Sequence, residues 1–304
     1  MALNTLEYST IMQTALDQHV VTHSTSGWME ANAGLVKYDG GKTIKLPKMS
    51  TTGLGDYDRD EGFNRKGKIT LDYQNYTMTQ DRGTSFQLDA MDVVETNFVA
   101  SASNAVKVFQ SEHVIPEIDA FRYATLTAKA KAATNHEAVT LSAANALTKF
   151  RTHVRAVRDY VGHETPLICT ITSEALALIE DNDKIQRTMS VTDFAQGEMK
   201  FKVKNIDDVI FRVVPSGRMW DKFIFETGAT AFGFKPDTAG NAKAVQWIIC
   251  PQNVPVAISR TDKLRVFDPD TNQSADAWKI DYRKYHDLWV LDSKLKALFA
   301  CTKA

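Results

Sequence analysis

Cysteine is scarce in this chain of 304 residues, and the few cysteines form no motif. Cys169, Cys250 and Cys301 are odd in number and widely spaced, so neither a disulfide framework nor a CxxC metal site is indicated. Cys169 and Cys250 lie inside apolar, strand-like runs, and we expect buried free thiols. Such thiols are typical of a protein made and kept in a reducing cytoplasm.

An excess of charge of one sign is also lacking. Lys and Arg total 36 and Asp and Glu total 37, which gives a net charge of −1. Because electrostatic binding of nucleic acid usually needs a basic excess or stripe, this balance argues against a nucleic-acid-binding module. No apolar run approaches the roughly 18 residues of a membrane span, and the first residues have no signal-peptide pattern. We therefore expect no membrane attachment.

Motifs of catalysis and cofactor binding are missing as well. The chain has no HExxH, no Walker A sequence and no GxSxG. Gly53-Leu-Gly55 lacks the third glycine of a dinucleotide fingerprint. His286 precedes Asp287, as in fragments of catalytic triads, but no nucleophile can be nominated. We expect a structural role for His286, no catalytic residue, no cofactor and no metal.

Two acidic segments resemble calcium loops without matching them. Counted from Asp56, Glu61 and Gly67 occupy the positions where an EF-hand loop needs Gly and Glu. In the second segment, residues 268–274, Gln273 stands where the glycine is needed. We predict a solvated loop for the first segment and a hydrogen-bonded turn for the second.

The strongest pattern lies between residues 36 and 131. Residues 42–49 and 68–88 alternate as strands do, and the turn-forming residues 50–67 separate them, which predicts a long two-stranded arm. Apolar residues then recur every three or four positions over residues 92–131, which predicts a helix on the order of 60 Å long. Pro116 either kinks this helix or opens a second one in its first turn. A compact domain of this size is roughly 50 Å wide, so these elements indicate an extended subunit whose surfaces neighbours cover.

The rest of the chain predicts an α/β subdomain. A clean apolar stripe indicates a helix over residues 147–161 that ends at Gly162. Residues 166–172 are continuously apolar, as in a strand buried on both faces, and Ser173 is expected to cap a short helix over residues 174–181. We expect further strands of one sheet at 199–206, 210–214, 223–225 and 244–250. Residues 264–302 are expected to be mostly strand, with a turn at 268–276.

Several motifs carry a resemblance to a known family. They are Met78-Thr-Gln-Asp-Arg82 with Phe86 and Asp89, the run from Val114 to Asp119 with Arg122, the run from Val266 to Asp270, Asn272-Gln273, Ala275-Asp-Ala-Trp278, the run from Asp281 to Asp287, and Val290-Leu-Asp292. In order and spacing they resemble the major capsid proteins of tailed bacteriophages with the Hong Kong 97-type fold. The resemblance covers about residues 5–303, and residues 132–250 match in pattern more than in motif.

The resemblance implies an α+β fold with named parts. Residues 1–36 would form the N-terminal arm and residues 37–89 the extended β-hairpin loop. Residues 90–135 would form the spine helix and the peripheral domain, which residues 263–304 complete. Residues 136–262 would form the axial domain.

The resemblance also implies a function. The chain would self-assemble into hexamers and pentamers of an icosahedral shell that encloses double-stranded DNA without sequence-specific binding. It would reside in the virion after assembly in the cytoplasm of a host bacterium. The chain begins almost directly at the arm, as in family members of mature length, so a separate scaffolding protein, or prior cleavage, and a portal are expected as partners. An encapsulin-like nanocompartment shell and, from another class, a cytoplasmic enzyme using His286 remain the alternatives.

The tip of the predicted arm carries charges of both signs. Acidic and basic side chains follow one another there, and the extended loop of the family lies across an adjacent subunit. We therefore expect the tip to meet complementary charges on a neighbour, through Asp56, Asp58, Arg59, Asp60, Glu61, Arg65, Lys66 and Lys68.

Overall fold

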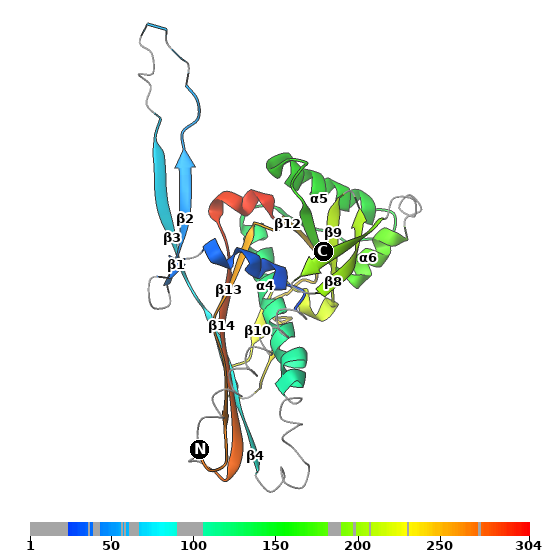
Figure 1. Cartoon of the computed structure of the whole chain (residues 1–304). Helices are drawn as coiled ribbons and strands as arrows, with labels where there is room; N and C mark the ends of the chain where they lie inside the picture. Colours follow the sequence, from blue (N-terminus) through cyan, green and yellow to red (C-terminus); the bar gives the residue numbers. More distant parts are fainter. Residues whose placement is uncertain are drawn as a thin grey trace.

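The computed structural model describes residues 24–35, 37–38, 43–55, 57, 59–60, 67–89, 106–181, 190–196, 199–206, 208–229, 231–272 and 275–304. Within them, helices combine with four β-sheets, so the predicted α+β class is confirmed. The molecule consists of an α/β body, a long narrow sheet along one edge of it, and a hairpin that projects from that edge (Figure 1).

A seven-stranded sheet forms the centre of the body. Across the sheet its strands are β5 (His136–Ala138), β15 (Phe299–Thr302), β12 (Val245–Pro251), β6 (Leu167–Thr172), β9 (Val209–Val214), β8 (Met199–Ile206) and β7 (Ser190–Gln196), the last two described by their backbone alone. All six residues of β6 are buried between β12 and β9, as the continuous apolar run predicted.

Two helices cover one face of this sheet. Helix α5 (Ala146–Val161) buries its apolar stripe there, including Phe150, and α6 (Ser173–Glu180) packs beside it. Gly162 ends α5 with φ of +86°, which confirms the predicted stop. The predicted cap of α6 is off by one residue. The hydroxyl of Thr172 accepts from the backbone N–H of Ala175 at 3.4 Å, because Thr172 keeps the extended conformation that an N-cap needs.

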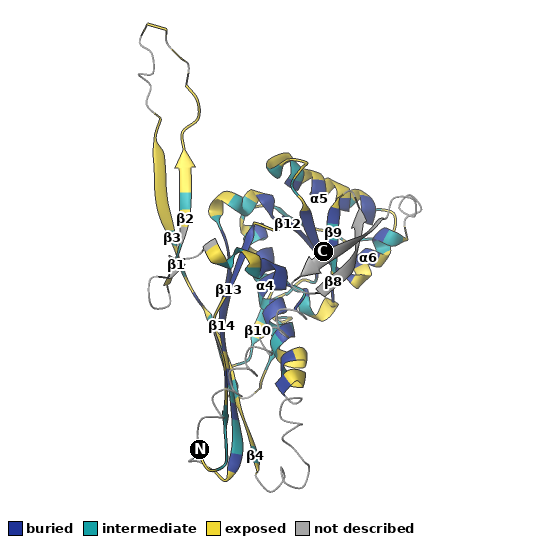
Figure 2. Ribbon diagram, in the orientation of Figure 1, coloured by how far each residue is buried: buried dark blue, intermediate teal, exposed yellow. Residues whose placement is uncertain are grey.

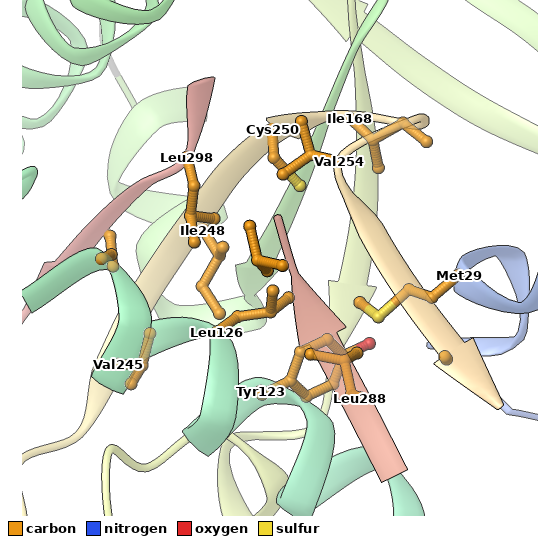
Figure 3. Packing of buried hydrophobic residues seen from close by; sticks show 14 of the residues in the cluster. Met29, Tyr123, Leu126, Ile168, Val245, Ile248, Cys250, Val254, Leu288 and Leu298 are labelled. Atoms are coloured by element: carbon orange, nitrogen blue, oxygen red, sulfur yellow. The ribbon is translucent and has the colours of Figure 1, made fainter. Parts of the chain in front are cut away.

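Helix α4 (Ile115–Ala132) covers the other face. Tyr123 and Leu126 meet Ile248 and Cys250 of the sheet in a second apolar core, to which Met29 also contributes (Figure 3). A π-helical turn, η2 (Gln110–Val114), and helical residues 106–109 precede α4, so the described part of the rod measures about 40 Å. Pro116 lies in the first turn of α4, the second of the two predicted placements. Residues 92–105 of the predicted helix lie outside the described residues.

A three-stranded antiparallel sheet runs along the edge of the body. Its central strand is β14 (Ala277–Val290), paired with β13 (Pro255–Phe267) on one side and β4 (Gln80–Asp89) on the other. The turn between β13 and β14 is confirmed, with the N–H of Thr271 donating to the carbonyl of Asp268 at 3.0 Å. The predicted strand at 223–225 forms, but as β10 (Phe223–Phe225) it pairs with β11 (Phe234–Pro236) outside the seven-stranded sheet.

The projecting hairpin consists of β2 (Thr43–Thr51) and β3 (Ile69–Thr77). The short β1 (Lys37–Tyr38) pairs with the edge of β2 that does not pair with β3. The predicted strand 68–88 is in fact two strands. It breaks at Met78, whose side chain is buried, and at Thr79, whose N–H and hydroxyl donate to the carboxylate of Asp287 at 2.7 and 3.0 Å. Beyond this break the chain leaves β2 and pairs with β14.

The boundaries between arm, loop, peripheral domain and axial domain stay a prediction. Strand β13 runs across the expected boundary at residue 262, and β15 from the C-terminal segment joins the seven-stranded sheet. Cys169, Cys250 and Cys301 are buried free thiols, as expected. Among the described helices, none combines the length and apolar character that crossing a membrane would require.

Candidate assembly surfaces

The base of the hairpin is clamped to the body by one of its two faces. Ile44 is buried, and the ring of Tyr76 lies 5.8 Å from that of Trp289. On the same face, Gln74 donates a hydrogen bond to Asp292. Because directly opposed residues of an antiparallel pair share a face, Ile44 and Tyr76 define the inner face of the hairpin.

Farther out, the apolar character moves to the opposite face. Met49 stands opposite Leu71, and Thr51 stands opposite Ile69. Side-chain exposure reaches 67% for Met49 and 73% for Ile69, far above what buried core positions show. The outer face is defined here by Pro47, Met49, Thr51, Ile69, Leu71 and Tyr73. It carries a row of apolar side chains on a part of the hairpin that Figure 2 shows exposed beyond the body.

The inner face of the same outer segment is polar. Lys48 stands opposite Asp72, and Ser50 stands opposite Thr70. Opposite charges across a strand pair stabilise the hairpin itself and interact well with water. The hairpin is therefore amphipathic, with its apolar side uncovered by any described part of the same chain.

The charged tip is described only in part. Asp56, Asp58, Glu61, Arg65 and Lys66 lie outside the described residues. Arg59, Asp60 and Lys68 are exposed, and the backbone of Lys68 pairs with Thr52 at the end of the hairpin. The expected contact of these charges with a neighbour stays a prediction.

A buried carboxylate fixes the point where the N-terminal segment meets α4. Asp119 is fully buried and accepts six hydrogen bonds. Five come from the backbone and hydroxyl groups of residues 24–26, at 2.6–3.1 Å, and one comes from Arg218 at 3.0 Å. This number of donors offsets the cost of burying a charge.

Arg122, one turn farther along α4, completes this anchor. Its guanidinium donates to the carbonyl of Ser26 at 3.2 Å and forms an ion pair with Glu30 of η1 (Gly27–Leu35). Burial alone would raise the pKa of Glu30, but the charge and hydrogen bond of Arg122 hold that pKa below its ordinary value. The segment from Ser24 to Glu30 is thus held to α4 by charge-assisted hydrogen bonds.

A cavity of about 490 Å³ lies between β4, β14, the start of α4 and the loop that joins β10 to β11. Arg82 of β4 forms an ion pair with Glu117 of α4 at 2.6 Å. The same guanidinium donates to the carbonyls of Glu226 and Gly233, at 2.7 and 3.3 Å. Arg82 therefore ties the two ends of that loop to the wall of the cavity.

His286 lines this cavity. It is buried, its ring packs edge-on against Phe121 at 5.5 Å, and its Nδ1 has no hydrogen-bond partner among the described residues. Burial and the nearby charges of Arg122, Lys284 and Arg82 hold its pKa well below the ordinary value. Among the described residues, no group of three His, Cys, Asp or Glu side chains lies close enough together to hold a metal ion.

A second buried histidine links α5 to the seven-stranded sheet. The indole N–H of Trp247 donates to Nδ1 of His153 at 3.1 Å, and Nε2 of His153 lies 2.6 Å from a carboxylate oxygen of Glu137. This pattern requires the neutral ring with its proton on Nε2. Burial lowers the pKa of His153 despite the opposing effect of Glu137.

Sequence reasoning missed the outer face and the loop at residues 226–233. The signal for the outer face was present, because apolar residues occupy odd positions at 47–49 and 69–73 whereas Ile44 is even. The loop was signalled by Gly228 and Gly233, both of which adopt positive φ.

The fold is shared with shell proteins of known structure. A chain from the mature capsid of bacteriophage PhiM1 matches with a TM-score of 0.58 at 13% identity, over 88% of this chain and 83% of that chain. A chain from the capsid of cyanophage P-SCSP1u matches with a TM-score of 0.58 at 10% identity, over 88% of this chain and 85% of that chain. A chain from a virus-like particle of Pyrococcus furiosus matches with a TM-score of 0.52 at 8% identity, over 98% of this chain and 100% of that chain.

These similarities establish the class of fold, that of proteins that build closed shells. More particularly, the chain has the Hong Kong 97-type fold of tailed-phage capsid proteins, as its motifs predicted. The sequence itself matches no protein-family model and no curated protein.

Proposed function

We propose that the chain is the major capsid protein of a tailed bacteriophage. It assembles into hexamers and pentamers of an icosahedral shell, located in the virion, around double-stranded DNA that it holds without sequence-specific contacts. Assembly takes place in the host cytoplasm with a separate scaffolding protein and a portal. The proposal is supported by the capsid fold and by the balanced charge of the chain.

The single observation that carries this proposal is the uncovered outer face of the hairpin. Six of the twelve large hydrophobic side chains exposed among the described residues belong to the hairpin and its tip: Met49, Leu54, Tyr57, Ile69, Leu71 and Tyr73. Apolar patches of more than a few hundred Å² mark interaction sites in soluble proteins. Burying Met49, Ile69 and Leu71 alone contributes roughly 5 kcal/mol before the entropy cost of association.

Electron microscopy of the purified chain, alone and with a phage scaffolding protein, tests the proposal. Closed shells or rings of five and six subunits are the expected result. A chain that stays monomeric by light scattering at shell-forming concentrations, with scaffold present, contradicts it.

A protein nanocompartment shell is the second candidate. The match to the virus-like particle from Pyrococcus furiosus, which spans nearly all of both chains, favours it. The contents of purified particles separate the two candidates, since a phage head encloses DNA and a nanocompartment encloses a protein cargo. If the chain is a shell protein and not an enzyme, replacing His286 by Ala is expected to damage folding or assembly, and no catalytic activity should be lost.

A further inference from the structure

The cavity beside Arg82 has the size and the wall of a small-molecule site. Its volume of about 490 Å³ lies within the roughly 300–1,000 Å³ that is typical of such sites. Phe86, Phe109, Phe232 and Tyr282 line it. Phe109 packs edge-on against Phe86 at 5.0 Å and against Tyr282 at 5.7 Å, so three of these rings form one cluster. A planar aromatic ligand packs favourably against a wall of this kind.

The fourth ring, that of Phe232, lies on a loop that is held in one conformation. Gly228 and Gly233 take φ values of +84° and +87°, which side chains with a Cβ rarely adopt. The ring of Phe232 packs directly over Gly228, 3.2 Å from where a Cβ would stand. Arg82 donates to the carbonyls at both ends of the loop. Because this wall is already formed without a ligand, binding costs less entropy than it would on a loose loop.

One buried polar atom of the cavity wall lacks a partner. His286 is only 2% exposed, and its Nδ1 has no hydrogen-bond partner among the described residues. Such an atom costs free energy, and nearly all buried polar atoms in native structures are bonded to protein or to ordered water. His286 lines the cavity, so a ligand there can supply the missing bond. A hydroxyl group both donates and accepts, and it therefore satisfies Nδ1 in either neutral tautomer.

The charges around His286 favour an oxygen at this position. The side chains whose charges lower the pKa of His286 are Arg122, Lys284 and Arg82, all of them cations. Arg82 and Lys284 also line the cavity. Nearby positive charge stabilises an oxygen that carries negative charge, as the acidic hydroxyl of a phenol can, and disfavours an ammonium group.

We propose that this cavity binds a phenol, a planar aromatic molecule whose ring lies against Phe86, Phe109 and Phe232 and whose hydroxyl bonds to Nδ1 of His286. The site goes beyond the proposed shell function and does not depend on it, because every group named belongs to a single chain. The probe is 2-naphthol, which combines a flat apolar ring system with one hydroxyl.

Equilibrium dialysis of the purified chain against 2-naphthol and against 2-methylnaphthalene, which has a similar shape without the hydroxyl, tests the site. In His286→Phe the preference for 2-naphthol is expected to fall about tenfold, because comparing two ligands on two proteins isolates the hydrogen bond. An unchanged preference in a variant that folds by circular dichroism overturns the bond. Absence of saturable 2-naphthol binding to the wild-type chain below about 1 mM overturns the site itself.

Nitrogen-15 NMR of the wild-type chain with labelled histidines needs no substitution. The Nδ1 signal of His286, assigned by through-bond correlation to the backbone, is expected to shift as 2-naphthol saturates the chain. His153 is an internal control, because its Nδ1 already accepts from Trp247 at 3.1 Å and should not shift. A His286 signal that stays in place while 2-naphthol binds contradicts the proposal.

Phe232→Ala tests the aromatic wall. The side chain is 79% exposed, so its loss should leave the fold intact. Binding of 2-naphthol is expected to weaken about fivefold, the value of one aromatic contact. Tyr57→Ala removes another exposed ring, near the tip of the hairpin, and should leave the dissociation constant unchanged. Equal weakening by the two substitutions, or none by Phe232→Ala, would remove Phe232 from the site.

Discussion

Single buried charges decide how firmly the parts of this subunit are joined. Asp119 accepts all six of its hydrogen bonds from residues that lie about a hundred positions away in sequence. Composition and periodicity place Asp119 on a helix but give no indication of its partners, because the interaction spans residues 24–26, α4 and Arg218. The motif that carried the resemblance contains this residue without showing its role.

Replacing Asp119 by Asn is expected to lower the free energy of unfolding by roughly 3 kcal/mol, because the donors of residues 24–26 lose a charged acceptor and Arg218 loses its counter-charge. Denaturant unfolding of the free subunit measures this loss. Asp159→Asn, on the exposed side of α5, is the control and should change stability by less than about 0.5 kcal/mol. Equal losses from the two substitutions would show that the anchor contributes nothing.

Mild acid is expected to destabilise the subunit through His153 and His286. Both have folded-state pKa values below the ordinary value of about 6.5, so the unfolded chain takes up these protons first. Stability is therefore complete above about pH 6.5 and falls as the pH drops through that value, by up to about 1.4 kcal/mol per pH unit for each histidine. The loss levels off below the folded-state pKa values.

Unfolding in denaturant at pH 7.5, 6.0 and 5.0 measures this loss. The variant His286→Asn should show a shallower fall between pH 7.5 and 5.0, because one of the histidines with a lowered pKa is gone. His163→Asn, at an exposed position after α5, should keep the wild-type slope. A slope that His286→Asn leaves unchanged would contradict the assignment.

At the scale of elements, alternation and apolar runs predicted most of the strands and helices correctly. Strand β6 and helix α5 match their patterns because both bury their apolar side chains in the core of the seven-stranded sheet. The end of α5 was predictable because it depends only on the positive φ that Gly162 itself adopts. The split of the strand at Met78 was not predictable from alternation, because β3 and β4 share one period. Only the contacts of Thr79 with Asp287, some two hundred residues apart, redirect the chain.

Shortening the hairpin tests its role as an element. Replacing residues 53–67 by Asn-Gly leaves Thr52 and Lys68 to close the hairpin with a two-residue turn. The subunit should fold normally, since the described residues within this stretch are all exposed, and should assemble poorly, because Leu54, Tyr57 and the tip charges are lost. Light scattering reports assembly and circular dichroism reports folding. Shells of normal yield from this variant would overturn the role assigned to the tip.

Arg82→Met tests how the loop at residues 226–233 is held. Loss of the guanidinium removes the bonds to Glu226 and Gly233, so backbone amides of this loop should exchange hydrogen for deuterium faster. Mass spectrometry of the exchanged peptides measures the rate. Arg283→Met, whose ion pair with Asp81 lies on the exposed surface, should leave exchange in the loop unchanged.

At the scale of the whole molecule, two kinds of association make different predictions about salt. Contacts between charged tips weaken as ionic strength rises, whereas burial of an apolar face does not. We expect the concentration needed for assembly to stay constant or fall between about 0.05 and 0.5 M NaCl, in the range where charges become screened. A rise of tenfold or more, followed by light scattering, would assign the main contact to the tip charges.

The route of the chain through Met78 has a mechanical consequence. Strand β3 of the hairpin continues into β4, and β4 is held along β14 by ten residue pairs in unbroken register. A pull on the hairpin acts along the strands, so all ten pairs resist together in shear and do not open one at a time. The carboxylate of Asp287 grips the chain where the load enters the sheet. In a subunit built in this way, tension on the hairpin would pass into the body through the backbone hydrogen bonds between β4 and β14.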